Sequence, residues 1–205
     1  YDVLVMAPGA SPVKPRSIGG IDGKNVYTVR NVADIVHLKD GLEAAGAENT
    51  AVIGGGFIGI EVAENLAKAG KKVTVVEAMS QILAPFDYDM VQMLHKELLD
   101  NGVSLIVDDG VKTIEEKQIT LASGKTVPAD AVILAIGVAP ETGLAKAAGL
   151  EIGETGGILV DHNYRTSDKN IYAVGDAIEV FDRMTGKPSR LALAGPALRQ
   201  ARAAA

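Results

Sequence analysis

The sequence contains no cysteine and no tryptophan, and its 205 residues include only three phenylalanines and five tyrosines. The lack of cysteine excludes disulfides, thiolate metal sites and a cysteine nucleophile within this stretch of chain. No apolar run approaches the roughly 20 residues that a membrane-spanning helix needs. The first residues also lack the basic and apolar layout of a signal peptide. We therefore expect a protein that has no membrane partner.

Acidic residues outnumber basic ones by 26 to 20, so the formal net charge is −6 and the sequence pI is about 5.1. Scattered basic residues without a stripe of aromatic rings do not form a nucleic-acid surface. The three histidines, His37, His95 and His162, are far apart and lack the spacing of metal ligands. We therefore expect solvated histidines, no metal site and no nucleic-acid partner.

Apolar residues and glycine are plentiful, and short apolar runs alternate with glycine turns along the chain. A helix that is capped by Asn31 and reaches about Ala45 would place Val32, Ile35, Val36 and Leu42 on its apolar side. The strand, helix, strand order after it predicts a βαβ unit with parallel strands, and hence an α/β fold. The expected strands are 1–6, 50–53, 72–77, 103–107, 131–136, 158–160 and 171–174, with short meander strands at 112–114 and 119–121; further helices are expected at 60–69, 88–101 and 193–204.

A glycine motif stands between the strand that ends at Ile53 and the next helix. Residues 54–59 read Gly-Gly-Gly-Phe-Ile-Gly and fit G-x-G-x-x-G. In this motif Gly54 permits a tight turn, Gly56 lets a pyrophosphate approach the backbone, and Gly59 lets the helix pack closely on the strand. The helix N-terminus offers N–H groups and partial positive charge to phosphates. A simple tight turn between a strand and a helix is the alternative.

An acidic residue follows at the position where a dinucleotide site needs one. Glu77 ends the next strand, 18 positions after Gly59, and a carboxylate there binds the hydroxyls of the adenosine ribose. A carboxylate repels a 2′-phosphate, and residues 78–80 (Ala-Met-Ser) supply no arginine to bind one. The sequence therefore predicts NAD binding with NADH preferred over NADPH. The alternative is a solvated carboxylate at a strand end.

Five segments in order, YDVLVMAPG, GGGFIGIEVAENL, VTVVE, AIGVAP and NIYAVGDA, resemble the pyridine nucleotide-disulfide oxidoreductases. The chain is most similar to their NADH oxidase, NADH peroxidase and coenzyme A-disulfide reductase branch, over essentially its whole length. The resemblance implies a Rossmann-like dinucleotide-binding domain with a β-meander, flanked by partial segments of an FAD-binding domain. Residues 1–26 would close the first FAD segment and form a linker, 27–139 the NAD domain, and 140–205 the truncated returning FAD segment.

The resemblance also implies roles for single residues of the NAD domain. Phe57 matches an aromatic that covers the flavin until nicotinamide displaces it, Glu61 a carboxylate near the nicotinamide, and Phe86 an aromatic that packs on adenine. Ordinary core packing is the alternative for both phenylalanines, and an early-helix acid favoured by the dipole is the alternative for Glu61. The positions matched to NAD binding are Gly54, Gly56, Ile58, Gly59, Glu77, Phe86 and Gly137.

The resemblance extends to FAD. Asp176 matches a residue that hydrogen-bonds the ribityl chain of the flavin. A loop-capping aspartate and a packed helix start are the alternatives in this part of the chain. Backbone positions along the flavin match Ala192, Leu193 and Ala194, and the turn near the FAD diphosphate matches Ala7, Pro8 and Gly9.

Three family features are not found between Tyr1 and Ala205: the glycine fingerprint for FAD, the redox cysteine and the C-terminal dimerisation domain. The resemblance places the first two before Tyr1 and the third after Ala205. We therefore expect the NADH-binding portion of a cytoplasmic, homodimeric, FAD-dependent oxidoreductase, which would be inactive as this portion alone. It would pass hydride from NADH to flavin and on to a disulfide, peroxide or oxygen. The alternatives are a ferredoxin or rubredoxin reductase-like flavoprotein and a non-catalytic NAD-binding module.

Overall fold

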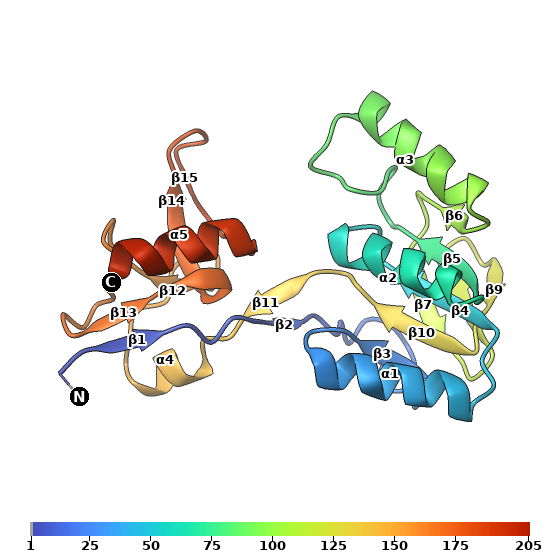
Figure 1. Ribbon diagram of the computed structural model, residues 1–205, viewed down its shortest axis with the longest axis horizontal. Helices are drawn as coiled ribbons and strands as arrows, with labels where there is room; N and C mark the ends of the chain where they lie inside the picture. The colour runs from blue at the N-terminus through green and yellow to red at the C-terminus, as the bar shows by residue number, and fades with distance from the viewer. Residues whose placement is uncertain (1) are drawn as a thin grey trace. The chain divides into compact units, whose positions relative to one another are not determined.

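The structure, a computed structural model, describes residues 2–205 and divides them into two compact units (Figure 1). The inserted unit is Pro12–Gly137, and the split unit comprises the residues up to Ser11 together with Val138–Ala205. The predicted boundaries at 26/27 and 139/140 therefore differ from the observed divisions at 11/12 and 137/138. Tyr1, the first residue of the predicted strand 1–6, lies outside the described residues.

The inserted unit is built on one parallel sheet in the order β3-β10-β4-β5-β6. Ala51 and Ile53 face one hydrophobic core, whereas Val52 between them faces the other. This alternation of two buried faces explains why the strands read as nearly continuous apolar runs. The α/β prediction is confirmed, with strands β3 (Val26–Thr28), β4 (Asn49–Ile53), β5 (Lys72–Val76), β6 (Ser104–Ile106) and β10 (Ala131–Leu134).

Helices α1 (Val32–Ala44), α2 (Phe57–Lys68) and α3 (Tyr88–Asp100) cover one face of the sheet. Figure 1 shows α1 in blue and α2 in cyan lying over the strands. Leu38 of α1 and Leu66 of α2 pack into the same core as Ile133 of β10. The three predicted helices are thus confirmed, although α2 starts at Phe57 and not at Ile60.

Helix α1 has the predicted cap but not the predicted apolar side. The Asn31 side chain accepts a hydrogen bond from Asp34 N–H (3.1 Å), and the Asp34 carboxylate accepts one from Asn31 N–H (3.0 Å). Leu42 is buried as expected, but Val32, Ile35 and Val36 are exposed. Helical periodicity identifies an apolar stripe without showing which part of it a neighbouring element covers.

The predicted β-meander is present and covers the opposite face of the sheet. Its antiparallel strands are β7 (Val111–Ile114), β8 (Gln118–Leu121) and β9 (Thr126–Pro128). Ile21 is buried in the core beneath these strands, and Gly19 pairs with Thr113. Residues 12–26 therefore belong to the inserted unit, and the prediction of a linker there was wrong. A run rich in glycine and proline resembles a linker even when its few apolar residues are buried.

The split unit contains a parallel strand pair, β1 (Leu4–Met6) with β13 (Ile171–Ala173), around which its core forms. Met6, Ile158 and Ile178 are among the buried residues of that core. Strands near 4–6, 158–159 and 171–173 and the last helix confirm predictions. The remaining elements are β2 (Ala10–Pro12), β11 (Val138–Pro140), β12 (Ile158–Leu159), β14 (Ile178–Asp182), β15 (Lys187–Ser189), α4 (Gly143–Ala147), the 3-10 turn η1 (Gly175–Ala177) and α5 (Ala194–Ala204).

No helix within residues 2–205 is long and apolar enough to cross a membrane.

Asp130, just before β10, joins three segments of the inserted unit. Its carboxylate accepts hydrogen bonds from Asn49 N–H (2.9 Å), Glu48 N–H (3.1 Å) and the Lys117 ammonium (3.2 Å). These bonds, led by the one from Asn49, lower the pKa of Asp130 from 3.8 to about 2. A carboxylate with a lowered pKa contributes stability above its unfolded-state pKa, and the contribution is lost as the pH falls towards the folded-state pKa.

We predict that Asp130→Asn lowers the free energy of unfolding most above about pH 4. The difference from the wild type should shrink as the pH falls through about 2, because the wild-type carboxyl then becomes neutral too. Denaturant unfolding at a series of pH values measures this difference. Asp40→Asn on the exposed side of α1 is the matched control and should leave the pH profile unchanged. An Asp130→Asn effect that does not depend on pH would contradict the assignment.

Candidate functional site

Close contacts with the backbone explain the first and third glycines of the motif between β4 and α2. Gly54 has φ +104°, and a Cβ there would lie 2.4 Å from the carbonyl oxygen of Ala135. Gly59 lies in the first turn of α2, where a Cβ would be 1.9 Å from the carbonyl oxygen of Gly54. The first and third glycines of the motif are thus explained by the tight turn and by close packing of the helix on the strand.

Gly56, the second motif glycine, is different because packing within the protein does not require it. Its backbone is extended (φ −77°), and no atom lies within 4 Å of the position that a Cβ would occupy. Gly56 is also the N-cap of α2, where no side chain caps the helix. The first N–H groups of a helix have no partner within the helix, so here they are available to an external acceptor. Open space beside such N–H groups suits a phosphate.

Glu77 lies next to this turn and is held by it. One carboxylate oxygen, Oε2, accepts a hydrogen bond from Gly55 N–H (2.7 Å), and Oε1 accepts one from Met79 N–H (2.8 Å). The side chain is half-buried, so it is not a freely solvated carboxylate at a strand end. The carbonyl oxygen of Gly55 accepts a bond from Leu83 N–H (2.8 Å). Gly55 therefore connects the acid with the β5–α3 loop, by which we mean residues 77–87.

Phe57 and Phe86 are both exposed, with 54% and 45% of their surfaces accessible. This exposure rules out ordinary core packing for either ring. The two rings form an edge-to-face pair with centroids 6.0 Å apart, a favourable arrangement for aromatic side chains. The pair joins the start of α2 to the β5–α3 loop.

Glu61 and Ile58 lie on the exposed side of α2. Together with Phe57 and with Ile35 of α1, they line a groove of about 850 Å³. Gly137 follows β10, the strand beside β4, and is exposed with φ +107°. The predicted NAD positions therefore gather at one edge of the parallel sheet.

The predicted FAD positions gather within the split unit. Met6 of β1 pairs with Ala173 of the parallel strand β13, so Ala7–Gly9 and Gly175-Asp176 follow the same edge of this pair. Gly175 N–H donates to Oε1 of Gln200 on α5 (2.7 Å), and Gln200 is buried. The exposed residues Ala192, Leu193 and Ala194 form the start of α5, where no side chain caps the helix.

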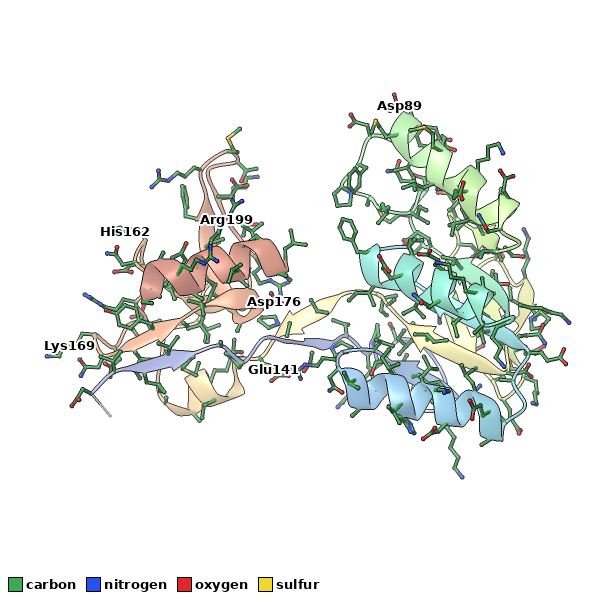
Figure 2. All side chains as sticks on the ribbon, viewed as in Figure 1. Asp89, Glu141, His162, Lys169, Asp176 and Arg199 are labelled. Carbon is green, nitrogen blue, oxygen red and sulfur yellow. The ribbon has the colours of Figure 1, made fainter. Side chains whose placement is uncertain are left out.

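Asp176 is half-buried, and within residues 2–205 no donor hydrogen-bonds to its carboxylate. Figure 2 shows Asp176 near the N-terminal end of α5. A loop-capping aspartate would accept bonds from neighbouring backbone N–H groups. The arrangement therefore favours an acceptor that is available to a ligand.

Sequence reasoning missed two residues of these sites, Gln200 and His95. His95 is half-buried, and its Nε2 accepts a bond from Ile82 N–H at a long 3.4 Å. The solvated position expected for this histidine was wrong. Helical spacing could have indicated the partial burial of His95. Val91, four residues before it, and Leu98, three residues after it, lie on the same helix face and are both buried. Over residues 2–205 there is no group of three or more His, Asp or Glu that could hold a metal ion.

Comparison with known proteins now identifies the family. Residues 1–201 match the family described as pyridine nucleotide-disulphide oxidoreductase. The chain belongs to this family. The predicted membership and the Rossmann-like α/β fold are both confirmed.

Three relatives illustrate the match. The NADH oxidase of Methanocaldococcus jannaschii is 38% identical over 208 residues, which cover 100% of this chain and 46% of that protein. The crystal structure of reduced Bacillus anthracis CoADR-RHD is 45% identical with a TM-score of 0.94, covering 100% of this chain and 37% of that one. The water-forming NADH oxidase from Lactobacillus brevis, bound to NADH, is 32% identical with a TM-score of 0.86, covering 99% and 45%. The chain thus spans less than half of each protein.

The two helix-end glycines provide a matched pair of substitutions. Gly59→Ala should destabilise the protein by about 1–3 kcal/mol, because its methyl group meets the Gly54 carbonyl oxygen. Gly56→Ala should leave stability within about 1 kcal/mol of the wild type, because its methyl group enters open space. It should nevertheless weaken NADH binding about tenfold or more, since the pyrophosphate loses charge-assisted hydrogen bonds.

Thermal melts and calorimetric titration with NADH measure the two effects. If Gly56→Ala binds NADH as the wild type does, the pyrophosphate does not occupy this space.

Proposed function

We propose that the chain is the NADH-binding portion of an FAD-dependent oxidoreductase that passes hydride from NADH to flavin. The electrons then reach a small-molecule acceptor, namely a disulfide, peroxide or oxygen. The observation that carries the proposal is the open space at Gly56, at the uncapped start of α2 and beside the Glu77 carboxylate. The chemistry itself belongs to the cofactors, so the protein's part is to bind and orient them.

The residues at this edge of the sheet would offer a partner to the pyrophosphate, the ribose and the adenine of the dinucleotide. The N–H groups of Phe57, Ile58 and Gly59 would donate to the pyrophosphate, where the helix dipole also favours negative charge. Glu77 would accept from the ribose hydroxyls with the lone pairs that Gly55 and Met79 leave unused, because a carboxylate has about four acceptor positions. The adenine would pack against the exposed ring of Phe86.

Glu77 also supports NADH as the preferred cofactor. A 2′-phosphate would meet a carboxylate that two backbone N–H groups hold in place, so the acid cannot easily turn away. The exposed residues Ala78, Met79 and Ser80 supply no guanidinium to offset that repulsion.

We predict that the wild type binds NADH several-fold more tightly than NADPH, and that Glu77→Ala weakens NADH binding by about 1–3 kcal/mol. Glu77→Ala combined with Ala78→Arg should prefer NADPH, because the repulsion is gone and a guanidinium can bind the 2′-phosphate. Calorimetric titration with each nucleotide measures this preference. Glu64→Ala, which removes an exposed acid of α2, is the control and should change neither affinity. Equal affinity of the wild type for both nucleotides would contradict the assignment of Glu77 to the ribose.

The split unit fits FAD, which when bound would accept hydride and pass electrons onward. Asp176 offers a carboxylate to the ribityl chain, and the exposed main chain of Ala192–Ala194 would lie along the flavin. The turn Ala7–Gly9 at the same strand edge would approach the diphosphate. Val3 and Val5 of the β1 segment are exposed, although parallel sheets are normally covered on both faces. We infer that further elements of the FAD domain cover this pair in the whole protein.

Phe57 and Glu61 would act at the nicotinamide end. The exposed Phe57 ring would cover the flavin in the absence of NADH, shielding it from oxygen, and would move aside when nicotinamide enters. Glu61, one helical turn later on the same exposed side of α2, would place its carboxylate near the nicotinamide. The homodimer and the cytoplasmic location implied by the family remain predictions about the whole protein.

We predict that Phe57→Ala in the full-length enzyme changes flavin reduction and reoxidation more than it changes NADH binding. Binding should stay within about tenfold, because the phosphate contacts are made by backbone N–H groups. Reduction by NADH should be altered, since the ring sets the hydride-transfer geometry, and reduced flavin should react faster with oxygen. Stopped-flow absorbance measures both rates. Because the ring is exposed but pairs with Phe86, stability should fall by only about 0.5–1.5 kcal/mol, the scale of one aromatic pair.

Tyr88→Ala, which removes an exposed ring at the start of α3, is the matched control and should leave NADH binding and both rates unchanged. Wild-type reduction and reoxidation rates in Phe57→Ala would show that Phe57 is not a flavin cover.

A further inference from the structure

The β5–α3 loop carries two of the proposed NADH contacts and packs directly on the glycine turn. Ile82 is completely buried, and a Cβ on Gly55 would lie 2.5 Å from its Cγ2 atom. Leu83, whose N–H donates to Gly55, has φ +47°, a left-handed conformation that residues other than glycine rarely adopt. The loop therefore holds an unfavourable backbone conformation because of its contacts with the turn.

Within residues 2–205, His95 is the only residue of α3 whose side chain hydrogen-bonds this loop. Its Nε2 accepts from Ile82 N–H, the residue that packs on Gly55. Of the loop's other side-chain bonds, the one from Gln81 to the Phe86 carbonyl oxygen and the one from Met79 N–H to Glu77 lie within the loop, and the one from Gly55 N–H to Glu77 joins it to the glycine turn. A histidine can accept at Nε2 only when it is neutral, with its hydrogen on Nδ1.

We propose that His95 is a positioning residue that holds the β5–α3 loop in its dinucleotide-binding conformation, and that protonation of His95 releases the loop and weakens binding. This inference rests on the proposed NADH site. Protonated His95 would carry a hydrogen on Nε2, so Ile82 N–H would face a donor in place of an acceptor. A buried N–H without an acceptor is unfavourable, and Ile82 would have to move away from α3.

Movement of Ile82 would reach the ligand by two routes. It would draw Leu83 from the Gly55 carbonyl and disturb the turn whose N–H orients the Glu77 carboxylate. It would also shift Phe86, whose N–H donates to the Leu83 carbonyl oxygen (2.9 Å). The adenosine half of the ligand would lose both its hydrogen-bond acceptor and its aromatic surface.

The direction of the pH dependence follows from burial of the ring, which lowers the pKa of His95 below its usual 6.5. Burial is the single cause of that shift. The charged residues on the surrounding elements contribute none: Glu77 and Asp87 of the loop, Glu64 and Lys68 of α2, and Asp89, Lys96, Glu97 and Asp100 of α3. A neutral form favoured by folding is fully populated above the unfolded-state pKa and is lost as the pH falls. Binding should therefore be constant above about pH 6.5 and weaken as the pH falls through the lowered pKa of His95.

ADP-ribose is the probe, because it carries adenine, ribose and pyrophosphate but no nicotinamide, so flavin cannot react with it. Calorimetric titration of the wild type should show about two- to tenfold weaker binding at about pH 5 than at about pH 8, the effect of one lost hydrogen bond. His95→Gln retains a neutral acceptor at both pH values, so its affinity should match the wild type at the higher pH and lose the dependence. His37→Gln and His162→Gln, at the other two histidines, should keep it.

Hydrogen exchange of the Ile82 amide in the wild type gives a second readout that needs no variant. The protection of this amide should decrease at low pH, when the loop is released, while the amides of strands β4 and β5 stay protected. The inference is overturned if His95→Gln keeps the wild-type dependence, or if the wild type binds equally at both pH values. Failure of ADP-ribose to bind at the higher pH would instead overturn the proposed NADH site.

Discussion

Helix α2 meets β4 with almost no space between the backbones, since even a methyl group on Gly59 would overlap the carbonyl oxygen of Gly54. This contact places the first turn of α2 directly over the end of the central strand. The uncapped N–H groups of the helix are thereby fixed at the edge of the sheet where Glu77 and Gly137 also lie. The proposed phosphate site depends on this contact, because flexible helix ends would not hold several donors in one arrangement.

Gly55 extends the same constraint to the rest of the site. Its N–H binds the Glu77 carboxylate, and its carbonyl oxygen binds Leu83. One residue without a side chain therefore couples the acid that faces the ribose with the loop that carries Phe86. A bulkier residue would displace Ile82. The groups proposed to bind adenosine are consequently part of one hydrogen-bonded unit with the groups proposed to bind phosphate.

Sequence reasoning succeeded where local rules decide the outcome. The Asn31 cap, the parallel strands around the glycine motif and the meander follow from capping chemistry and from periodicity, and all are present. It failed where burial depends on distant contacts. Residues 12–26 resembled a linker but supply Ile21 to a core, and Val32, Ile35 and Val36 resembled a buried face but are exposed.

The sequence by itself determined the family, the α/β class and the identity of the motif glycines and Glu77, because turn geometry and charge act within a few residues of each position. Only the tertiary structure decided that the space predicted beside Gly56 is open. It also decided that Phe57 and Phe86 form an exposed pair and that His95 reaches the β5–α3 loop. Open space, exposure and the partner of a side chain depend on segments that are distant in sequence, and their packing is not encoded in any single segment.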